Sequence, residues 1–259
     1  MVIDSLEDWR EQMRNIRMVI EYDGSRYDGW QKQARAGSNT IQDKIEQVLG
    51  KMEGKPVELI GAARTEAGVH AYGQIANFKT DSKLKLYEIK QYLNRYLPMD
   101  IAVLEVDEVA ERFHSIFLAK AFVYEYKVSV AEVPSVFQRK YEYYSFHKLD
   151  REKMMQGAKY ALGKHDFRAF SDNKRMKKST ERTIHSIDIY ADFDSLSITV
   201  EVDDCWPRMI RILVGTLLAI GKGEKQPEDM KKIIDSLDRE QAGETAEAKG
   251  LFLNDVIYE

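Results

Sequence analysis

The alternation of apolar and polar residues predicts a first half built from four strands and two helices. Residues 16–22 alternate as a half-buried strand does, and they end at the turn formed by Asp23 and Gly24. A helix over 40–52 is predicted by apolar residues at helical spacing, namely Ile41, Ile45, Val48, Leu49 and Met52. The remaining predicted elements are strands at 57–62 and 73–79, a helix at 87–96 and a strand at 101–107. This β-α-β-β-α-β order is ferredoxin-like.

The second half of the chain repeats this order with additions. The pattern predicts a strand at 119–130, a helix at 151–162, strands at 183–192 and 196–203, helices at 208–220 and 227–236, and a last strand at 251–258. We therefore predict an α+β fold in which two ferredoxin-like (RRM-like) halves share an extended, mostly antiparallel sheet with a central cleft. The predicted organisation is an N-terminal extension over 1–15, an N-terminal half over 16–110 and a C-terminal half over 111–259. A ligand site is expected at the junction of the two halves.

Composition is typical of an ordinary globular protein, with 259 residues of which 44% are hydrophobic and 32% charged. The longest mostly apolar run, 209–220, is interrupted by Arg211 and is shorter than the roughly 20 residues of a membrane span. The N-terminus lacks the basic-then-apolar layout of a signal peptide, so we expect a cytoplasmic protein without membrane association. The single cysteine, Cys205, and five scattered histidines show no metal-ligand spacing, and we expect no metal.

The distribution of charge bears on whether nucleic acid is a partner. A net charge of -4 argues mildly against RNA, because phosphate binding depends on concentrated lysine and arginine. The basic residues are nevertheless concentrated locally in one polar segment, at Lys174, Arg175, Lys177 and Lys178. Such a run is by itself typical of a solvated loop. Beside an RNA-directed site, it becomes a candidate contact to the RNA backbone.

The most informative stretch is the loop over 61–73, which reads Gly-Ala-Ala-Arg-Thr-Glu-Ala-Gly-Val-His-Ala-Tyr-Gly. It places Arg64 and Glu66 two residues apart on a corner between two strands, where a rigid scaffold positions loop residues. The stretch closely resembles the catalytic loop of the tRNA pseudouridine synthase A (TruA) family, Gly-Ala-Gly-Arg-Thr-Asp-Ala-Gly-Val-His-Ala-x-Gly. Glu66 stands where that family has its catalytic aspartate.

Other segments resemble the same family, in the family's own order. Residues 22–33, Tyr-Asp-Gly-Ser-Arg-Tyr-Asp-Gly-Trp-Gln-Lys-Gln, are similar to its N-terminal motif. Further similar segments are 113–114, 119–120, 124–126, 163–167, 182–184, 209–217 and 248–253. The resemblance spans roughly 16–258, which is far more specific than any single short motif.

The resemblance implies an enzyme that isomerises uridine to pseudouridine in the anticodon stem-loop of tRNA. It implies no cofactor and a homodimer whose two clefts share one tRNA. Arg64 matches the residue that occupies the space left by the flipped uridine, and Glu66 matches the nucleophile that attacks the sugar or the base. Arg211 matches the cation that keeps this carboxylate ionised and aimed, and Tyr124 matches a tyrosine that stacks on the uracil. The apolar floor beneath the base is matched by Leu251 and Leu253.

Departures from the family pattern gather at the site. Glu66 is one methylene longer than aspartate, and a displacement of about 1 Å can lower a rate on the order of a hundredfold. Ala63 replaces a glycine, Ile116 replaces an arginine, and Cys205 begins a Cys-Trp-Pro-Arg run in place of Phe-Leu. If position 63 needs a positive φ, a side chain there is disfavoured.

Several interpretations therefore stay open. The chain is a working synthase in which other changes re-aim Glu66, or an inactive paralogue that binds and remodels RNA. A ferredoxin-like interaction protein unrelated to RNA is the third, and the contiguous motif order disfavours it. Taken singly, Tyr124 is more typical of a strand core, whereas its place in the family's motif order favours the functional role. His70 is assigned a structural role, and Trp30 is compatible with either core packing or RNA contact.

Overall fold

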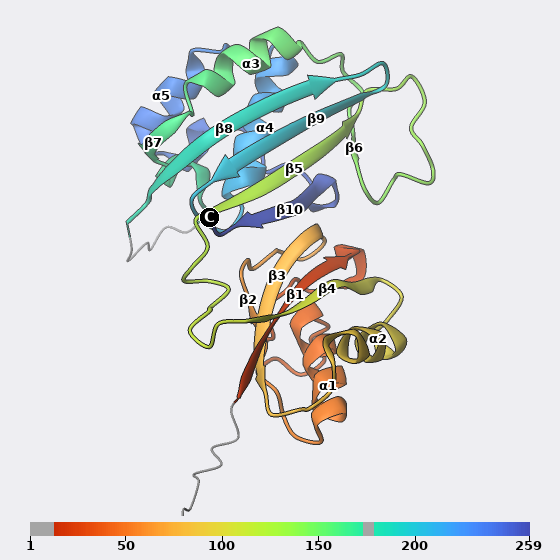
Figure 1. Ribbon diagram of the computed structural model, residues 1–259. Coiled ribbons are helices and arrows are strands. Elements are labelled where there is room, and N and C mark those ends of the chain that lie inside the picture. The colour runs from red at the N-terminus through yellow and green to blue at the C-terminus, as the bar shows by residue number, and fades with distance from the viewer. Residues whose placement is uncertain (1–12, 173–178) are drawn as a thin grey trace, which may run out of the picture.

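The computed structural model describes residues 13–172 and 179–259, and within them ten strands form one sheet (Figure 1). The strands are β1 Arg14–Tyr22, β2 Ile60–Gly61, β3 His70–Thr80, β4 Ile101–Val109, β5 Ala121–Ser129, β6 Tyr143–Tyr144, β7 Gly163–Asp166, β8 Glu181–Ala191, β9 Ser195–Val202 and β10 Leu251–Ile257. Their order is β4-β1-β3-β10-β5-β9-β8-β7, with β2 beside β3 and β6 beside β5. The predicted α+β fold with one shared sheet is confirmed.

Both halves have the ferredoxin-like strand arrangement. In the first half β1 lies between β4 and β3, and β2 pairs with the far side of β3, all antiparallel. In the second half β5 lies between β10 and β9, and β8 pairs with the far side of β9, again all antiparallel. The halves meet where β10 runs parallel to β3, with Phe252 opposite His70 and Leu253 opposite Ala71. The division of the chain at residue 110 stays a prediction.

The element bounds differ from the sequence prediction mainly around β3. The strand predicted at 57–62 is reduced to the two residues of β2. One edge of β3 is shared between two partners, because β2 pairs with 76–77 while β10 pairs with 70–71. β3 also begins three residues earlier than predicted, at His70 rather than 73. The short strands β6 and β7 were not predicted, since two and four residues show no usable periodicity.

The helices are α1 Ile41–Glu53, α2 Leu86–Tyr96, α3 Arg151–Lys159, α4 Met209–Gly221 and α5 Asp229–Ser236. Figure 1 shows α1 and α2 beside the first half of the sheet, and α3, α4 and α5 beside the second half. Every residue of α4 except Arg211 is buried, so this helix is the core of the second half. Arg211 is the one partly exposed residue of α4. None of the described helices is both long enough and apolar enough to span a bilayer.

Candidate active site

The loop between β2 and β3, which carries Glu66, is held against the first half of the sheet through Thr65. The Thr65 carbonyl accepts the backbone N–H of Trp30 at 3.0 Å, and the Thr65 hydroxyl lies 2.7 Å from the Tyr22 hydroxyl. Trp30 is buried, and its indole lies so close to Gly61 that a Cβ there would come within 2.3 Å of the ring. Trp30 therefore packs in the core, which the sequence left open.

The other end of the loop is held by the buried amide of Gln74. The Ala63 N–H donates to Gln74 Oε1 at 3.1 Å, and Gln74 Nε2 donates to the Ala63 carbonyl at 2.7 Å. The described residues with a positive φ do not include Ala63. Alanine therefore fits without backbone strain where the resembling family has glycine, and the loop backbone is fixed on both sides of Arg64.

The Glu66 carboxylate is bound by the start of α4. Arg211 Nη1 donates to Glu66 Oε2 at 2.5 Å, and the backbone N–H of Arg208 donates to Glu66 Oε1 at 2.6 Å. Arg211 is itself oriented by a hydrogen bond from its Nε to the Ala246 carbonyl at 2.7 Å. The side chains of Glu66 and Arg211 are only 25% and 16% exposed. Charge-assisted hydrogen bonds to both oxygens fix the direction of the carboxylate.

A cavity of about 580 Å³ opens between this loop and α4. Its walls bring together residues from the loop, β5, α4 and β10, namely Arg64, Glu66, Tyr124, Arg211 and Leu251. Leu253 is instead buried opposite Tyr124 in the pairing of β10 with β5, outside the cavity wall. Five of the site residues named from the sequence thus meet at one cavity between the two halves.

Tyr124 and Cys205 meet on one wall of the cavity. Cys205 Sγ lies 3.5 Å from the Tyr124 hydroxyl. Burial raises the pKa of Tyr124 well above its ordinary value, and burial raises the pKa of the Cys205 thiol to about 12. Both groups are therefore neutral near pH 7. Tyr124 offers the cavity an aromatic surface and an un-ionised hydroxyl.

Two further features lie at the cavity mouth. Arg64 is exposed, and the described residues offer it neither a hydrogen bond nor an ion pair. Ile116 and Phe117, which are 37% and 79% exposed, add apolar surface where the resembling family has an arginine. The mouth therefore combines one unpaired cation with side chains that can contact the flat face of a base.

His70 lies on a different hollow from Glu66, one lined by Asp23, Tyr141 and Phe252. Its Nδ1 accepts the Gly24 N–H at 3.0 Å, and its Nε2 lies 3.1 Å from the Lys140 carbonyl. Burial lowers the pKa of His70. With both ring nitrogens engaged and the ring stacked on Phe252, His70 has a structural place.

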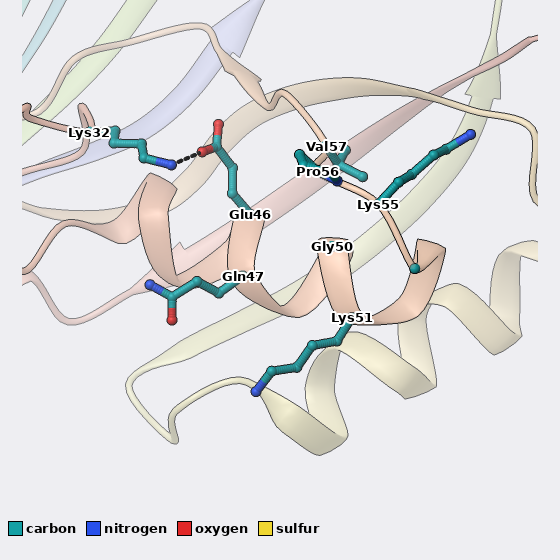
Figure 2. Close-up of a pocket in the computed structure, with 9 residues that line it drawn as sticks. Lys32, Glu46, Gln47, Gly50, Lys51, Lys55, Pro56 and Val57 are labelled. Atoms are coloured by element: carbon teal, nitrogen blue, oxygen red, sulfur yellow. Dashed lines mark hydrogen bonds and ion pairs between the residues drawn. The ribbon is translucent and has the colours of Figure 1, made fainter.

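The basic residues named as candidate RNA contacts are not placed at the cavity. The predicted contact residues Lys174, Arg175, Lys177 and Lys178 lie outside the described residues. A separate hollow of about 400 Å³ lies beside α1. Figure 2 shows Lys32 there, pointing toward Glu46. Lys32 lies 3.0 Å from Glu46 and 3.2 Å from Asp43, so its charge is paired locally.

The sequence did not predict three linked residues, of which one, Arg208, contacts the Glu66 carboxylate. Arg208 donates to Glu66 through its backbone, and its side chain forms an ion pair with Asp172 at 2.7 Å. Asp172 also pairs with Arg239 at 2.9 Å. These residues come from three segments far apart in the sequence, and only the folded arrangement brings them together.

Comparison with known proteins identifies the family of this chain. The family described as tRNA pseudouridine synthase matches residues 18–117 and 158–259. This match covers most of the paired ferredoxin-like sheet and the loop that carries Glu66, and it places the molecule among the pseudouridine synthases. The chain belongs to the tRNA pseudouridine synthase family.

The curated relatives are named for one member of that family. A tRNA pseudouridine synthase A from Bacillus sp. (strain KSM-64) is 46% identical over 246 residues, covering 95% of this chain and all of the relative. The tRNA pseudouridine synthase A of Acetivibrio thermocellus is 42% identical over the same share of both chains. A tRNA pseudouridine synthase A 2 from Clostridium perfringens is also 42% identical over that share.

Proposed function

We propose that this protein isomerises uridine to pseudouridine in the anticodon stem-loop of tRNA, with Glu66 as the catalytic carboxylate. The observation that carries the proposal is the Glu66–Arg211 ion pair, at 2.5 Å, on the wall of a cavity large enough for a flipped nucleotide. The names of relatives that align over their whole length support tRNA as the substrate. The specific position in tRNA follows from the family resemblance of the catalytic loop.

The reaction needs few groups from the protein. The bond between N1 of uracil and C1′ of the ribose breaks, a bond between C5 and C1′ forms, C5 loses a proton and N1 gains one. Product and substrate are isomers, so no co-substrate is consumed. A carboxylate assists by attacking the sugar or the base so that the freed base can rotate. Glu66, fixed by two donors and partly exposed to the cavity, is placed for that role.

The neighbouring residues take complementary roles in this proposal. Arg64, exposed and unpaired among the described residues, enters the stack in place of the flipped uridine. Tyr124 and Leu251 hold the base, Tyr124 through its aromatic surface and neutral hydroxyl. Because the Tyr124 phenol is un-ionised, it acts on the C5 proton only as a neutral hydroxyl.

We further propose that the protein is a cytoplasmic homodimer that binds one tRNA across both subunits, without cofactor. The proposal rests on the family resemblance. Light scattering at working concentration should give about twice the 30.0 kDa of one chain. A stable mass near 30.0 kDa would overturn it.

The test of function uses unmodified tRNA transcripts. The purified protein is incubated with each transcript, and pseudouridine is mapped by chemical adducts that stop primer extension. We expect product at a uridine of the anticodon stem-loop with the wild-type protein and none with Glu66→Gln. The Glu66→Gln variant should keep its tRNA affinity, because a nucleophile contributes to the transition state more than to binding.

Two outcomes would contradict the proposal. A wild-type protein that binds tRNA yet makes no pseudouridine would favour the inactive paralogue that binds and remodels RNA. An active Glu66→Gln variant would exclude Glu66 as the nucleophile.

A further inference from the structure

The backbone of Arg208 adopts a conformation that arginine rarely occupies. Its φ is 67° and its ψ is -1°, in the left-handed region, at the residue immediately before α4. A non-glycine residue there is strained by steric contact between its Cβ and the backbone. In this conformation the Arg208 N–H points at Glu66 Oε1, 2.6 Å away. Strain in the backbone therefore coincides with a contact to the candidate nucleophile.

The side chain of Arg208 is fixed by a chain of ion pairs. Arg208 Nη1 donates to Asp172 Oδ2 at 2.7 Å, and Arg239 Nε donates to Asp172 Oδ1 at 2.9 Å. Arg239 is held in turn by the Gly243 carbonyl and the Thr245 hydroxyl, both at 3.0 Å. The Arg208 guanidinium lowers the pKa of the Asp172 carboxyl, so Asp172 is ionised at neutral pH.

Both donors to Glu66 are consequently anchored on the segment over 239–246. Arg211 is tied to this segment through the Ala246 carbonyl, and Arg208 is tied to it through Asp172 and Arg239. One ion pair alone lets a glutamate side chain rotate about its extra bond. Two donors on different oxygens, anchored to the same segment, define a single orientation.

We propose that Asp172 and Arg208 are positioning residues, which hold the Arg208 N–H against Glu66 and so fix the carboxylate for attack. The inference rests on the proposed function, since positioning matters only if Glu66 reacts. Asp172 holds the Arg208 side chain, which keeps the backbone in its left-handed conformation. The length of glutamate is accommodated in this way, because the carboxylate reaches the first turn of α4.

The first experiment compares Arg208→Gly with Arg208→Ala in single-turnover pseudouridine formation. Both variants lack the guanidinium and its ion pair with Asp172, and they differ only in how readily residue 208 adopts a positive φ. If the backbone N–H positions Glu66, Arg208→Gly should turn over roughly five- to tenfold faster than Arg208→Ala, with the same tRNA affinity. Equal rates in the two variants would overturn the inference and would assign Arg208 to charge alone.

The second experiment introduces Asp172→Ala into the otherwise wild-type protein and into Arg208→Gly. Asp172→Ala should lower the rate of the otherwise wild-type protein by a similar factor, and it should have no further effect in Arg208→Gly, where its partner is gone. Additive losses would contradict a shared role. Asp235→Ala is the matched control, because Asp235 is an exposed carboxylate that pairs with Lys231 on α5. This control should leave the rate unchanged.

The third measurement separates this inference from the proposed function. Amide hydrogen exchange at residue 208, followed by NMR in ¹⁵N-labelled protein, requires no activity. The wild-type N–H should be protected, and Asp172→Ala should speed its exchange at least tenfold, whereas Asp235→Ala should not. An inactive wild-type protein with this exchange pattern would refute the function and keep the positioning contact. If the wild-type protein is active but Asp172→Ala leaves the exchange rate at residue 208 unchanged, the proposed function stands and the positioning role is refuted.

Discussion

Glu66 is longer by one methylene than the aspartate of the resembling family, and its carboxylate reaches two donors on α4. We predict that Glu66→Asp reacts no faster than wild type, because the shorter side chain withdraws the carboxylate from Arg208 and Arg211. A displacement of about 1 Å can lower the rate on the order of a hundredfold. Single-turnover kinetics with tRNA transcripts would measure it. A faster Glu66→Asp would mean that the extra methylene is a defect rather than an adapted feature.

Cys205 allows a prediction about pH. Burial raises the pKa of its thiol from 9.0 to about 12, so the folded protein favours the neutral thiol. The resulting stability is complete below pH 9 and is lost as pH rises toward 12. At pH 8 the thiolate population should be about a thousandfold smaller than in the unfolded chain. Alkylation by iodoacetamide should therefore be far slower in the native protein than in urea. Equal rates would contradict the raised pKa of the thiol.

Among the elements, the loop that carries Glu66 depends on close contact with the segment that follows β1. Gly29 has a φ of 98°, and a Cβ at this position would lie 2.7 Å from the Thr65 carbonyl oxygen. We predict that Gly29→Ala lowers the free energy of unfolding by about 2 kcal/mol or more, from backbone strain and overpacking together. Denaturant titration would measure the change. The rate of pseudouridine formation should also fall, since the loop must shift.

Gly37 provides a matched control for this prediction. Its φ is 77°, yet a Cβ there would meet nothing within 4 Å. Gly37→Ala should therefore show only the cost of a positive φ, about 1 kcal/mol. If Gly29→Ala and Gly37→Ala lowered the free energy of unfolding equally, the close contact between Gly29 and the loop would contribute nothing to stability.

The order of the elements could be predicted from the sequence, and their contacts could not. Helical spacing identified α1 because its buried residues Ile41, Ile45 and Leu49 follow one face. The strand at 57–62 was overestimated, because its pattern does not reveal that β10 occupies part of the β3 edge. Asp172 and Arg208 were not predicted at all, since their meeting depends on tertiary packing between segments 36 residues apart.

At the scale of the whole molecule, the charge balance makes tRNA binding dependent on local basic groups. The net charge is -4, so we expect attraction to RNA to depend on local cations, with Arg64 and the basic segment that includes Lys174 as the candidates. We predict that tRNA affinity falls steeply with salt, close to one unit of log-log slope for each neutralised phosphate. Filter binding across a salt series would measure this slope. A salt-insensitive affinity would exclude RNA backbone contact as the main interaction.

Charge reversal tests the basic segment directly. Replacing Lys174, Arg175, Lys177 and Lys178 together by glutamate should weaken tRNA binding and reduce the salt slope. A control that reverses Lys231 and Lys232 on α5 changes half as many charges, at lysines that each pair with a nearby aspartate. An unchanged affinity would identify the basic segment as a solvated loop.

The parallel contact between β3 and β10 has a consequence for biosynthesis. The ribosome makes the Glu66 loop early and α4 much later, and it makes β10 after every other described strand. A nascent chain that already holds β4, β1 and β3 still lacks both the donors to Glu66 and the strand that covers the 70–71 edge of β3. That edge stays open to unwanted strand pairing until β10 emerges. Under the proposed function, each copy becomes able to modify tRNA only after tRNAs have finished decoding its last strand.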